Sequence, residues 1–326
     1  MIGIVGLGRI GSQVLKECRK IRSTVICADQ VYTPYEDELK ECSTIVCTAP
    51  VSAITFWAEF AARNGANFIS VTEDHAAAAA CKQFYQSTDQ KGVCVPQRGL
   101  APGIVNIIAS YLISRCTSRV RSVQLRVGAL PLSAIDDVYA YTWSEDGVAN
   151  EYSKPTYIVR NHEVKVVKSV SDVETLFING VQFEAFNTSG GIGTMHETYG
   201  NNLKVKNIDY KSIRYPGTHK VLCDTPNHKF PVLATNDDVV HVVVKVVDDN
   251  NKQYSYTTSV YGDETGTAIQ KTTAAGVMIW VKLLEYGNNL NLENSIDQED
   301  IWMCGSQAHI HEIINSCLSE AQMNTL

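Results

Sequence analysis

The sequence contains no apolar segment long enough to cross a membrane. The longest uncharged stretches, such as Ala275–Val281, fall well short of the roughly 20 residues that a transmembrane helix needs. We also expect no secretory leader, because Met1 runs directly into the apolar residues Ile2–Val5 without a basic region or a small-residue cleavage site. We therefore expect a cytoplasmic protein that makes no contact with a membrane.

An excess of positive charge is also missing. The 28 lysines and arginines are outnumbered by 35 acidic residues, so that the formal net charge is -7 and the isoelectric point is near 5.6. Nucleic acids and anionic membranes are bound through basic patches. The charge balance therefore predicts a small-molecule partner and no nucleic acid.

The ten cysteines show none of the spacings that would give them a special role. No two of them form a CxxC pair, and several lie in apolar runs, as do Cys27, Cys47 and Cys94. The histidines also lack ligand spacing, since His309 and His311 would point to different faces of a helix. We expect reduced core cysteines and no metal.

The first third of the chain alternates short apolar runs with helical patterns. The apolar runs are Ile2–Val5, Thr24–Ala28, Thr44–Thr48, Asn67–Val71 and Val93–Pro96. The helical patterns are Ile10–Ile21, Tyr35–Glu41, Val51–Asn64 and Ala76–Gln90. Strands separated by helices predict an α/β fold, a doubly wound parallel Rossmann sheet with helices on both faces.

Beyond a helix predicted over Ile104–Cys116, the pattern becomes rich in strands. These strands are Ser122–Val127, Thr156–Val159, Val164–Val167, Val239–Val247 and Tyr254–Val260. Their alternation predicts an inserted α/β domain with a mixed or antiparallel sheet. Helices return at Thr267–Tyr286 and Ile296–Ala321, and the first should pack back on the nucleotide domain. We predict a discontinuous Rossmann domain over 1–118 and 265–326, and a substrate and dimerisation domain over 119–264.

A glycine-rich motif, Gly6-Leu7-Gly8-Arg9-Ile10-Gly11, follows the first predicted strand and opens the first helix. The first glycine allows a tight turn, the second lets the backbone approach a pyrophosphate, and the third lets helix and strand pack closely. The helix N-terminus, with Arg9 and Ile10, then offers N–H groups to phosphate. The motif predicts a dinucleotide site. The alternative is a Rossmann-like fold that binds another nucleotide or none.

Asp29 ends the second apolar run, 18 positions beyond Gly11. A carboxylate there accepts hydrogen bonds from both ribose hydroxyls and repels a 2′-phosphate, so NAD is predicted over NADP. Thr48-Ala49-Pro50 ends the third strand and is predicted to pass beside the cofactor, although an ordinary strand-to-helix turn explains it equally well.

The segment Gly99-Leu100-Ala101-Pro102-Gly103-Ile104-Val105-Asn106 resembles the G-x-x-P-G-x-x-N signature of the saccharopine dehydrogenase-like family. The resemblance continues in order through Tyr141–Gly147, Glu151–Pro155, Ser171–Glu174, Phe183–Gly191, Tyr210–Gly217 and Thr267–Ile269. It implies that Pro102, Gly103 and Asn106 also lie at the cofactor.

Within this family the sequence is most similar to lysine 6-dehydrogenases, through its Ala-Pro-Gly form, its Glu184–Gly191 run and its length. The similarity implies oxidation of a terminal amine to an imine, with hydride passing to NAD. Three departures from the lysine 6-dehydrogenase pattern leave the substrate open. Gln97-Arg98 stands where these enzymes often have an acidic residue, and Thr218 separates Gly217 from His219, where they have a histidine directly after the glycine. The stretch Val221–Asp237 is also shorter than in those enzymes. The alternatives are reductive condensation of an aldehyde with an amine, and an NAD(H) sensor without turnover.

Oxidation of an amine needs a base and groups that fix the substrate. The predicted catalytic residues are Glu73, His75 and Tyr141, and the predicted substrate-binding residues are Glu145, Asn187, Thr188, Ser189, Arg214 and Tyr215. Arg214 is the leading candidate for anchoring a substrate carboxylate, because a guanidinium donates two parallel hydrogen bonds. Tyr141, Glu145 and Tyr152 are candidates for holding the substrate amine.

Each of these residues has a structural alternative. Arg214 could form an internal ion pair, Asp74 could cap a helix beside a surface His75, and the tyrosines could be core residues. A homodimer or homotetramer is also expected.

Overall fold

The computed structural model describes residues 1–22, 24–29, 36–87, 89, 91–132, 140–142, 145–225, 231, 233, 235–286, 297, 301–302 and 306–326, the side chains of residues 36, 145 and 146 excepted. These residues form two compact units, which we call unit 1 (Met1–Ile104 and Gln270–Leu326) and unit 2 (Val105–Ile269). The sequence pattern places the same two transitions at 118/119 and 264/265. The structure puts the first one earlier, before a helix whose Asn106 side chain bonds within unit 2.

Unit 1 is built on a parallel sheet of five strands. They are β1 (Ile2–Val5), β2 (Val25–Ala28), β3 (Thr44–Cys47), β4 (Asn67–Ser70) and β5 (Cys94–Val95), in the order β2-β1-β3-β4-β5. The doubly wound α/β sheet predicted from the apolar runs is confirmed. Because the order reverses between β1 and β3, the carboxyl ends of these two strands form the switch point at which open α/β sheets bind ligands.

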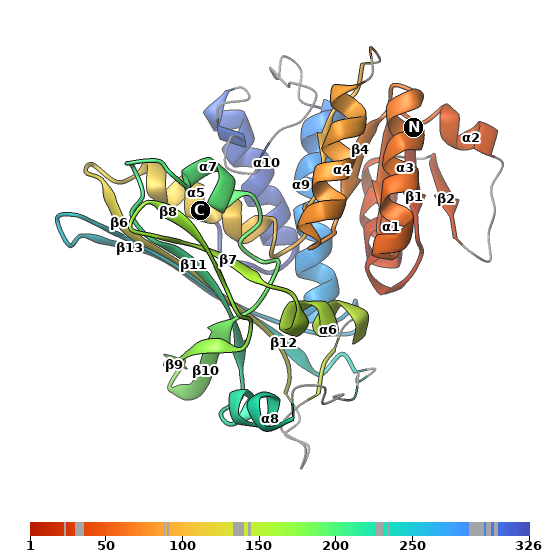
Figure 1. The fold of residues 1–326 in the computed structure, drawn as a ribbon. Coiled ribbons are helices and arrows are strands. Elements are labelled where there is room, and N and C mark those ends of the chain that lie inside the picture. The colour runs from red at the N-terminus through yellow and green to blue at the C-terminus, as the bar shows by residue number, and fades with distance from the viewer. Residues whose placement is uncertain are drawn as a thin grey trace. The chain divides into compact units, whose positions relative to one another are not determined.

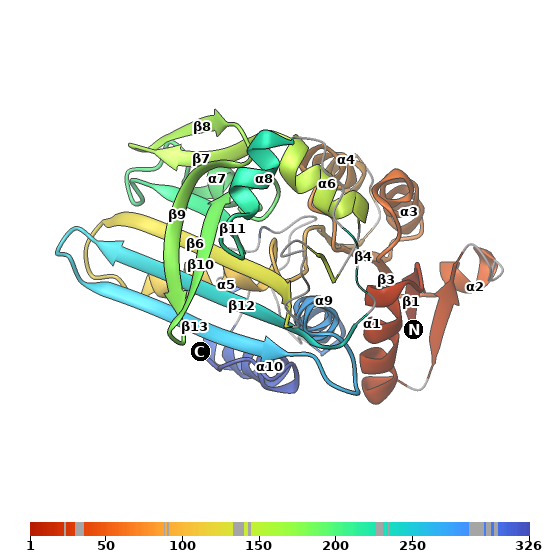
Figure 2. The same cartoon turned by 90° about the horizontal axis from the view of Figure 1, so that it is seen from below.

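Helices cover both faces of this sheet, as Figure 2 shows. The helices of unit 1 are α1 (Arg9–Ile21), α2 (Glu36–Lys40), α3 (Val51–Arg63), α4 (His75–Gln86), α9 (Ala268–Tyr286) and α10 (Gln307–Glu320). The helices α3 and α4 pack over one face, around a core that includes Cys47, Phe68 and Tyr85.

On the other face α9 returns to the first strands. Glu285 of α9 accepts hydrogen bonds from Arg22 at 3.0 Å and from Thr44 at 2.8 Å, and Met278 contacts Cys18 of α1. The predicted return of this helix is therefore observed. The last predicted helix, Ile296–Ala321, is described as α10 from Gln307 onward, and residues 303–305 before it lie outside the described residues.

Unit 2 contains an eight-stranded sheet (Figure 1). Its strands are β6 (Val120–Pro131), β7 (Thr156–Arg160), β8 (Glu163–Val167), β9 (Ser171–Ile178), β10 (Val181–Asn187), β11 (Ile208–Arg214), β12 (Asp238–Asp248) and β13 (Gln253–Tyr261). The main path is β13-β12-β6-β11-β10-β9, with β7 and β8 attached beside β11. The sheet is mixed because β6 and β11 pair in parallel. Its helices are α5 (Ile104–Ser114), α6 (Glu145–Ser153), α7 (Met195–Tyr199) and α8 (Thr218–Asp224).

Three of these strands, β9, β10 and β11, are not among those that the sequence periodicity predicts. The hairpin β9–β10 does carry a local signal, because Asn179 and Gly180 at its turn have φ angles of 50° and 81°. Two successive positive φ angles define a type I′ turn, for which Asn-Gly is the preferred pair. The strand β11 has no such signal, since three of its seven residues, Asp209, Lys211 and Arg214, are charged although every residue is buried.

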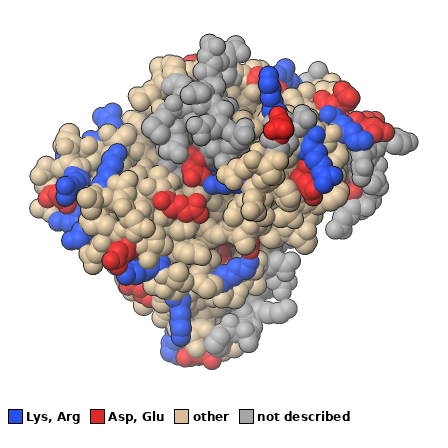
Figure 3. Space-filling view, turned by 45° about the horizontal axis from the view of Figure 1, so that its top comes forward, with Lys and Arg blue, Asp and Glu red and all other residues tan. Residues whose placement is uncertain are grey.

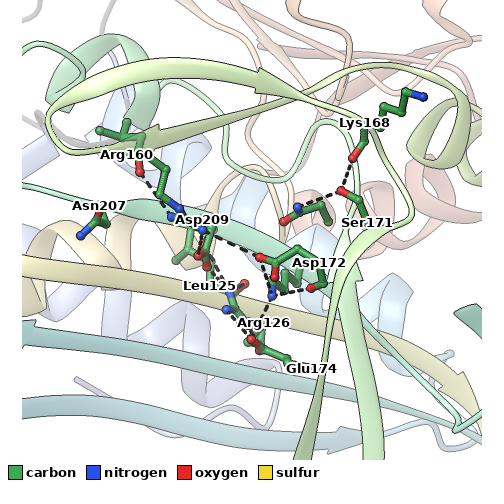
Figure 4. A network of polar contacts seen from close by, with 12 residues as sticks. Leu125, Arg126, Arg160, Lys168, Ser171, Asp172, Glu174, Asn207 and Asp209 are labelled. Atoms are coloured by element: carbon green, nitrogen blue, oxygen red, sulfur yellow. Dashed lines mark hydrogen bonds and ion pairs between the residues drawn. The ribbon is translucent and has the colours of Figure 1, made fainter.

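One face of β11 holds a network of charged residues that is buried at its centre and exposed at its edge (Figure 4). Arg126, 3% exposed, donates to Asp209 at 2.6 Å and to Glu174. Lys211, 2% exposed, lies 3.0 Å from both Glu174 and Asp172, and Arg160 donates to Asp209 at 2.8 Å. Buried charges are tolerated when they are paired and hydrogen-bonded. The network therefore ties β9 to β6 and β11.

Exposed charges of both signs mix over the molecular surface, as Figure 3 shows for one face. Many of them pair locally, as in Lys20–Glu17, Arg63–Glu59 and Lys220–Asp224. Exposed pairs of this kind contribute little to stability. None of the helices in the described ranges combines the length and apolar character that crossing a bilayer requires.

The buried network predicts the effect of Asp209→Asn. Burial acts to raise the pKa of Asp209, but Arg126 and Arg160 outweigh it, and the net pKa lies below the usual value. The substitution leaves Arg126 and Arg160 with too little negative charge, so the free energy of unfolding should fall by about 3 kcal/mol in urea titrations. Glu163→Gln, in the exposed pair with Lys165, is the control and should leave the unfolding midpoint unchanged. Equal midpoints for all three proteins would contradict this account.

His241 predicts a pH dependence of stability. It is 6% exposed, contacts Ser259 through Nδ1, and burial lowers its pKa from 6.5 to about 4. The unfolded chain binds this proton below about pH 6.5 while the folded protein does not, so stability is complete above that pH and is lost as the pH falls toward 4, by about 3 kcal/mol at most. In His241→Gln the melting temperature should change less between pH 4 and pH 6.5 than in the wild type. His309→Gln, at an exposed histidine, should keep the wild-type dependence of melting temperature on pH.

Candidate functional site

The glycine motif forms a tight turn at the carboxyl end of β1. Gly6 has a φ of +86°, and a Cβ on it would lie 2.7 Å from the backbone N of Ala49. A Cβ on Gly11 would lie 1.8 Å from the Gly6 carbonyl oxygen. Both positions therefore require glycine, because α1 and the β3–α3 connection approach the turn backbone to backbone.

Gly8 has a different role in the same turn. It is the N-cap of α1, and a Cβ on it would meet no atom of the described residues within 4 Å. Within the described residues the space beside Gly8 is thus open, and a glycine N-cap has no side chain with which to cap the N–H groups of the first turn of α1, from Arg9 and Ile10. This combination of open backbone and positive helix end fits the pyrophosphate of a dinucleotide.

Asp29 lies beside this turn at the end of β2. Its Oδ2 accepts a hydrogen bond from the Leu7 N–H at 2.5 Å. The carboxylate is thus fixed next to the glycine motif, at the position predicted to face a ribose. Residues 30–35, which follow it, lie outside the described residues.

Thr48, Ala49 and Pro50 connect β3 to α3 and lie against the glycine turn. The Thr48 N–H bonds the Val5 carbonyl, and the Thr48 hydroxyl donates to the Gly6 carbonyl at 2.6 Å. Pro50 is the N-cap of α3. The tripeptide therefore supports the shape of the turn, which gives it a structural role beside the predicted cofactor role.

The predicted Pro-Gly segment is closely packed in unit 1. Gly103 has a φ of +140°, and a Cβ on it would lie 1.9 Å from the Gly99 carbonyl oxygen. On α9, a Cβ on Gly276 would lie 2.1 Å from the same oxygen. The peptide bond before Pro102 is cis. In unit 2, Asn106 is fully buried and its Nδ2 donates to the Ile192 carbonyl at 2.8 Å.

The predicted acid–base residues of unit 1 lie at the carboxyl end of β4. His75 is the first residue of α4, and Asp74 caps that helix by accepting from the Ala77 N–H at 2.8 Å. Glu73 precedes the cap and, like His75, is half-buried. Asp74 thus has the capping role, and a catalytic role for Glu73 and His75 stays a prediction.

In unit 2, Arg214 joins a buried polar group that we call the tyrosine–arginine cluster: Tyr141, Glu151, Tyr152 and Arg214. The Arg214 guanidinium donates to the Tyr152 hydroxyl at 2.6 Å, to Glu151 at 2.9 Å and to the Ile213 carbonyl at 2.8 Å. Its carbon Cζ lies 5.6 Å from each tyrosine ring centroid. The internal ion pair considered as an alternative is therefore present.

The protonation states in this cluster follow from its burial. Burial raises the pKa of Tyr141, and the neighbouring Tyr152 raises it further. Burial also raises the pKa of Glu151, although Arg214 opposes the change. Tyr141 is thus a neutral phenol near neutral pH, a hydrogen-bond donor in place of a base.

Two further predicted residues adjoin this cluster. The Thr188 hydroxyl hydrogen-bonds Ser212 of β11 at 2.7 Å, and the Ser189 N–H donates to the Glu151 carbonyl at 2.9 Å. Gly191, two residues after Ser189, is packed closely, since a Cβ on it would lie 2.2 Å from the Tyr210 ring.

Asn187 and Tyr215 have other neighbours. Asn187 Nδ2 donates to Ser171 at 3.2 Å, and the Tyr215 hydroxyl donates to the Pro131 carbonyl at 2.7 Å. Tyr215 packs with Phe183, away from the cluster. Glu145 is the first residue of α6, but its side chain lies outside the described residues.

Glu151 of the cluster and Ser212, the partner of Thr188, are not predicted as site residues from the sequence. Glu151 lies in a segment that carries the family resemblance, which is its only signal. Its pairing with Arg214 links positions 63 apart, and no sequence spacing indicates such a contact.

Comparison with known proteins agrees with this architecture. Residues 99–228 match the family model of the saccharopine dehydrogenase C-terminal domain. Among solved structures, the chain is similar to saccharopine dehydrogenase (L-Glu forming) from Saccharomyces cerevisiae, with 12% identity over 98% of this chain and 97% of that one and a TM-score of 0.72.

A more distant likeness is to aspartate dehydrogenase from Thermotoga maritima, with 11% identity over 88% of this chain and 97% of that one, but its TM-score of 0.40 adds nothing to the argument. The chain thus contains a segment that matches the saccharopine dehydrogenase C-terminal domain, and it has the fold of a saccharopine dehydrogenase.

Proposed function

We propose that this protein is an NAD-dependent dehydrogenase that acts on the C–N bond of a small amino acid or amine, in the manner of a lysine 6-dehydrogenase. The observation that carries the proposal is the match of residues 99–228 to the saccharopine dehydrogenase C-terminal domain. In the same chain, the turn at Gly6–Gly11 is suited to a dinucleotide. The Ala101-Pro102-Gly103 form and the Glu184–Gly191 run support the lysine-type activity over others in the family.

The residues of unit 1 would hold the cofactor. Gly8 and the first turn of α1 would bind its pyrophosphate, and Asp29 would accept hydrogen bonds from its ribose hydroxyls. Once bound, the nicotinamide would take up a hydride from the substrate carbon. The fixed carboxylate of Asp29 would repel a 2′-phosphate, which supports NAD over NADP.

The substrate amine must be neutral before hydride can leave its carbon, so a base is required. His75 has the side chain whose ordinary pKa lies nearest neutrality, and Glu73 lies two residues before it. We assign proton removal to this pair. Tyr141 would support the substrate site as a neutral donor through its bond to Tyr152, at 2.8 Å.

A second candidate is reductive condensation, in which an aldehyde and an amine form an imine that the reduced cofactor converts to a secondary amine. The similarity in fold to saccharopine dehydrogenase (L-Glu forming) supports it. A product of this type needs anchors for two charged ends, whereas lysine needs one carboxylate site.

A substrate panel distinguishes these activities. The protein is incubated with lysine, ornithine, saccharopine or polyamines and with NAD or NADP, and NADH or NADPH is followed by its absorbance. Turnover with lysine and NAD is expected. Turnover with saccharopine alone would select the second candidate, and binding of NADH without turnover of any substrate would indicate a sensor.

Asp29→Asn tests the choice of cofactor. The amide oxygen of asparagine can still accept from the Leu7 N–H, so the turn is kept while the negative charge is removed. We expect the ratio of kcat/KM for NADP to that for NAD to rise by about tenfold or more, because the repulsion of the 2′-phosphate is lost. A wild-type preference for NADP would contradict the role of Asp29.

Gly8 and Gly11 form a matched pair for the phosphate site. Gly8→Ala has room for its Cβ, so its melting temperature should stay near wild type while NADH binding weakens by about tenfold or more, since the methyl group occupies the approach to the backbone. Gly11→Ala should lower the melting temperature and also weaken NADH binding, because its Cβ collides with the Gly6 carbonyl. Wild-type NADH affinity in Gly8→Ala, measured by fluorescence titration, would rule out this cradle.

A further inference from the structure

The hydrogen bonds of the tyrosine–arginine cluster converge on one oxygen, the hydroxyl of Tyr152. Arg214 Nε donates to it at 2.6 Å and the Tyr141 hydroxyl donates to it at 2.8 Å. A phenol oxygen has two lone pairs and one proton. Both lone pairs of Tyr152 are therefore used.

The hydroxyl proton of Tyr152, by contrast, forms no hydrogen bond within the described residues. In the part of the chain that the structure describes, the Tyr152 hydroxyl accepts two hydrogen bonds and donates none to a protein acceptor. A phenol that accepts from a guanidinium and from a second phenol is polarised, and it becomes a stronger donor. The cluster thus ends in one activated O–H group.

Exposure singles out the same residue. Tyr141 is 4% exposed, Arg214 is 5% and Glu151 is 7%, whereas Tyr152 is half-buried. Among the described residues of the cluster, Tyr152 therefore has the largest exposed fraction. The charge of Arg214 is already balanced by Glu151 at 2.9 Å.

We propose that the Tyr152 hydroxyl is the direct hydrogen-bond donor to a carboxylate oxygen of the substrate, and that Arg214 acts behind it as a positioning residue. This inference rests on the proposed function in taking an amino acid as the substrate. It replaces two roles expected from the sequence, the direct anchoring by Arg214 and the binding of the amine by Tyr152.

The chemistry of the cluster selects the carboxylate end of the substrate. An ammonium group has only donors, and it would need a lone pair that Tyr152 no longer offers. A carboxylate has only acceptors, and it matches the single available proton. The cluster therefore distinguishes an amino acid from the amine that lacks the carboxylate.

Lysine and 1,5-diaminopentane test this distinction, because they differ only in the carboxylate. Binding of each to the full-length protein with NADH is measured by isothermal titration calorimetry for wild type and Tyr152→Phe. We expect the ratio of lysine affinity to diamine affinity to fall by about tenfold or more in the variant. Tyr254→Phe is the control and should keep the wild-type ratio, since its buried hydroxyl has no hydrogen-bond partner among the described residues.

Tyr141→Phe provides a second variant that keeps the Tyr152 proton. It removes one donor to the Tyr152 oxygen and releases a lone pair, so the affinity for the diamine should stay or rise while the lysine affinity falls. This change in selectivity does not arise from a general loss of structure, and it keeps the inference testable if Tyr152→Phe does not fold.

The outcomes separate this inference from the proposed function. Equal weakening of lysine and diamine in Tyr152→Phe, an unchanged ratio, or a wild-type protein that prefers the diamine would overturn the role of Tyr152. Selective binding of lysine without any turnover would leave the role of Tyr152 standing and refute the proposed dehydrogenase activity.

Discussion

The buried guanidinium of Arg214 constrains the polar interior of unit 2. A charge of this kind is strongly destabilising unless it is paired and its donors are satisfied. Glu151, the Ile213 carbonyl and the Tyr152 hydroxyl meet these needs. Glu151 and Tyr152 belong to α6, whereas Ile213 precedes Arg214 on β11. The placement of α6 against β11 follows from this requirement, since Glu151 and Tyr152 are neighbours on that helix.

The strand β11 carries this charge because a strand presents alternate residues to opposite faces. Ser212 and Arg214 face the tyrosine–arginine cluster, whereas Asp209 and Lys211 face the network with Arg126 and Glu174. One short strand therefore supports a candidate ligand-binding group on one face and a structural ion network on the other. A shift of its register by one residue would exchange the two and leave both sets of charges unpaired.

Unit 1 depends on a different constraint, the close approach of backbone to backbone. Gly11 lies against the Gly6 carbonyl, and Gly103 and Gly276 lie against the Gly99 carbonyl. Any side chain at these glycines would occupy the position of a neighbouring carbonyl. The predicted cofactor turn and the Pro-Gly segment are shaped by this packing, and Thr48 adds a hydroxyl bond to the turn.

The sequence alone determines the features of this protein that are local. The parallel strands, the helices between them, the glycine motif and its acidic partner Asp29 all follow from periodicity and short spacings, because neighbouring residues decide them. The Asn179-Gly180 turn is equally local and indicates the β9–β10 hairpin. The ordered motifs also indicate the family, since each is a continuous segment.

Only the tertiary structure decides how the polar residues are used. Arg214 reads from the sequence as an anchor for a carboxylate, yet its contact with Glu151 spans 63 positions and is set by how α6 packs on β11. β11 itself has too many charged residues to be predicted as a buried strand. Pairing between distant charges depends on three-dimensional proximity, and a linear pattern of residue types does not contain that information.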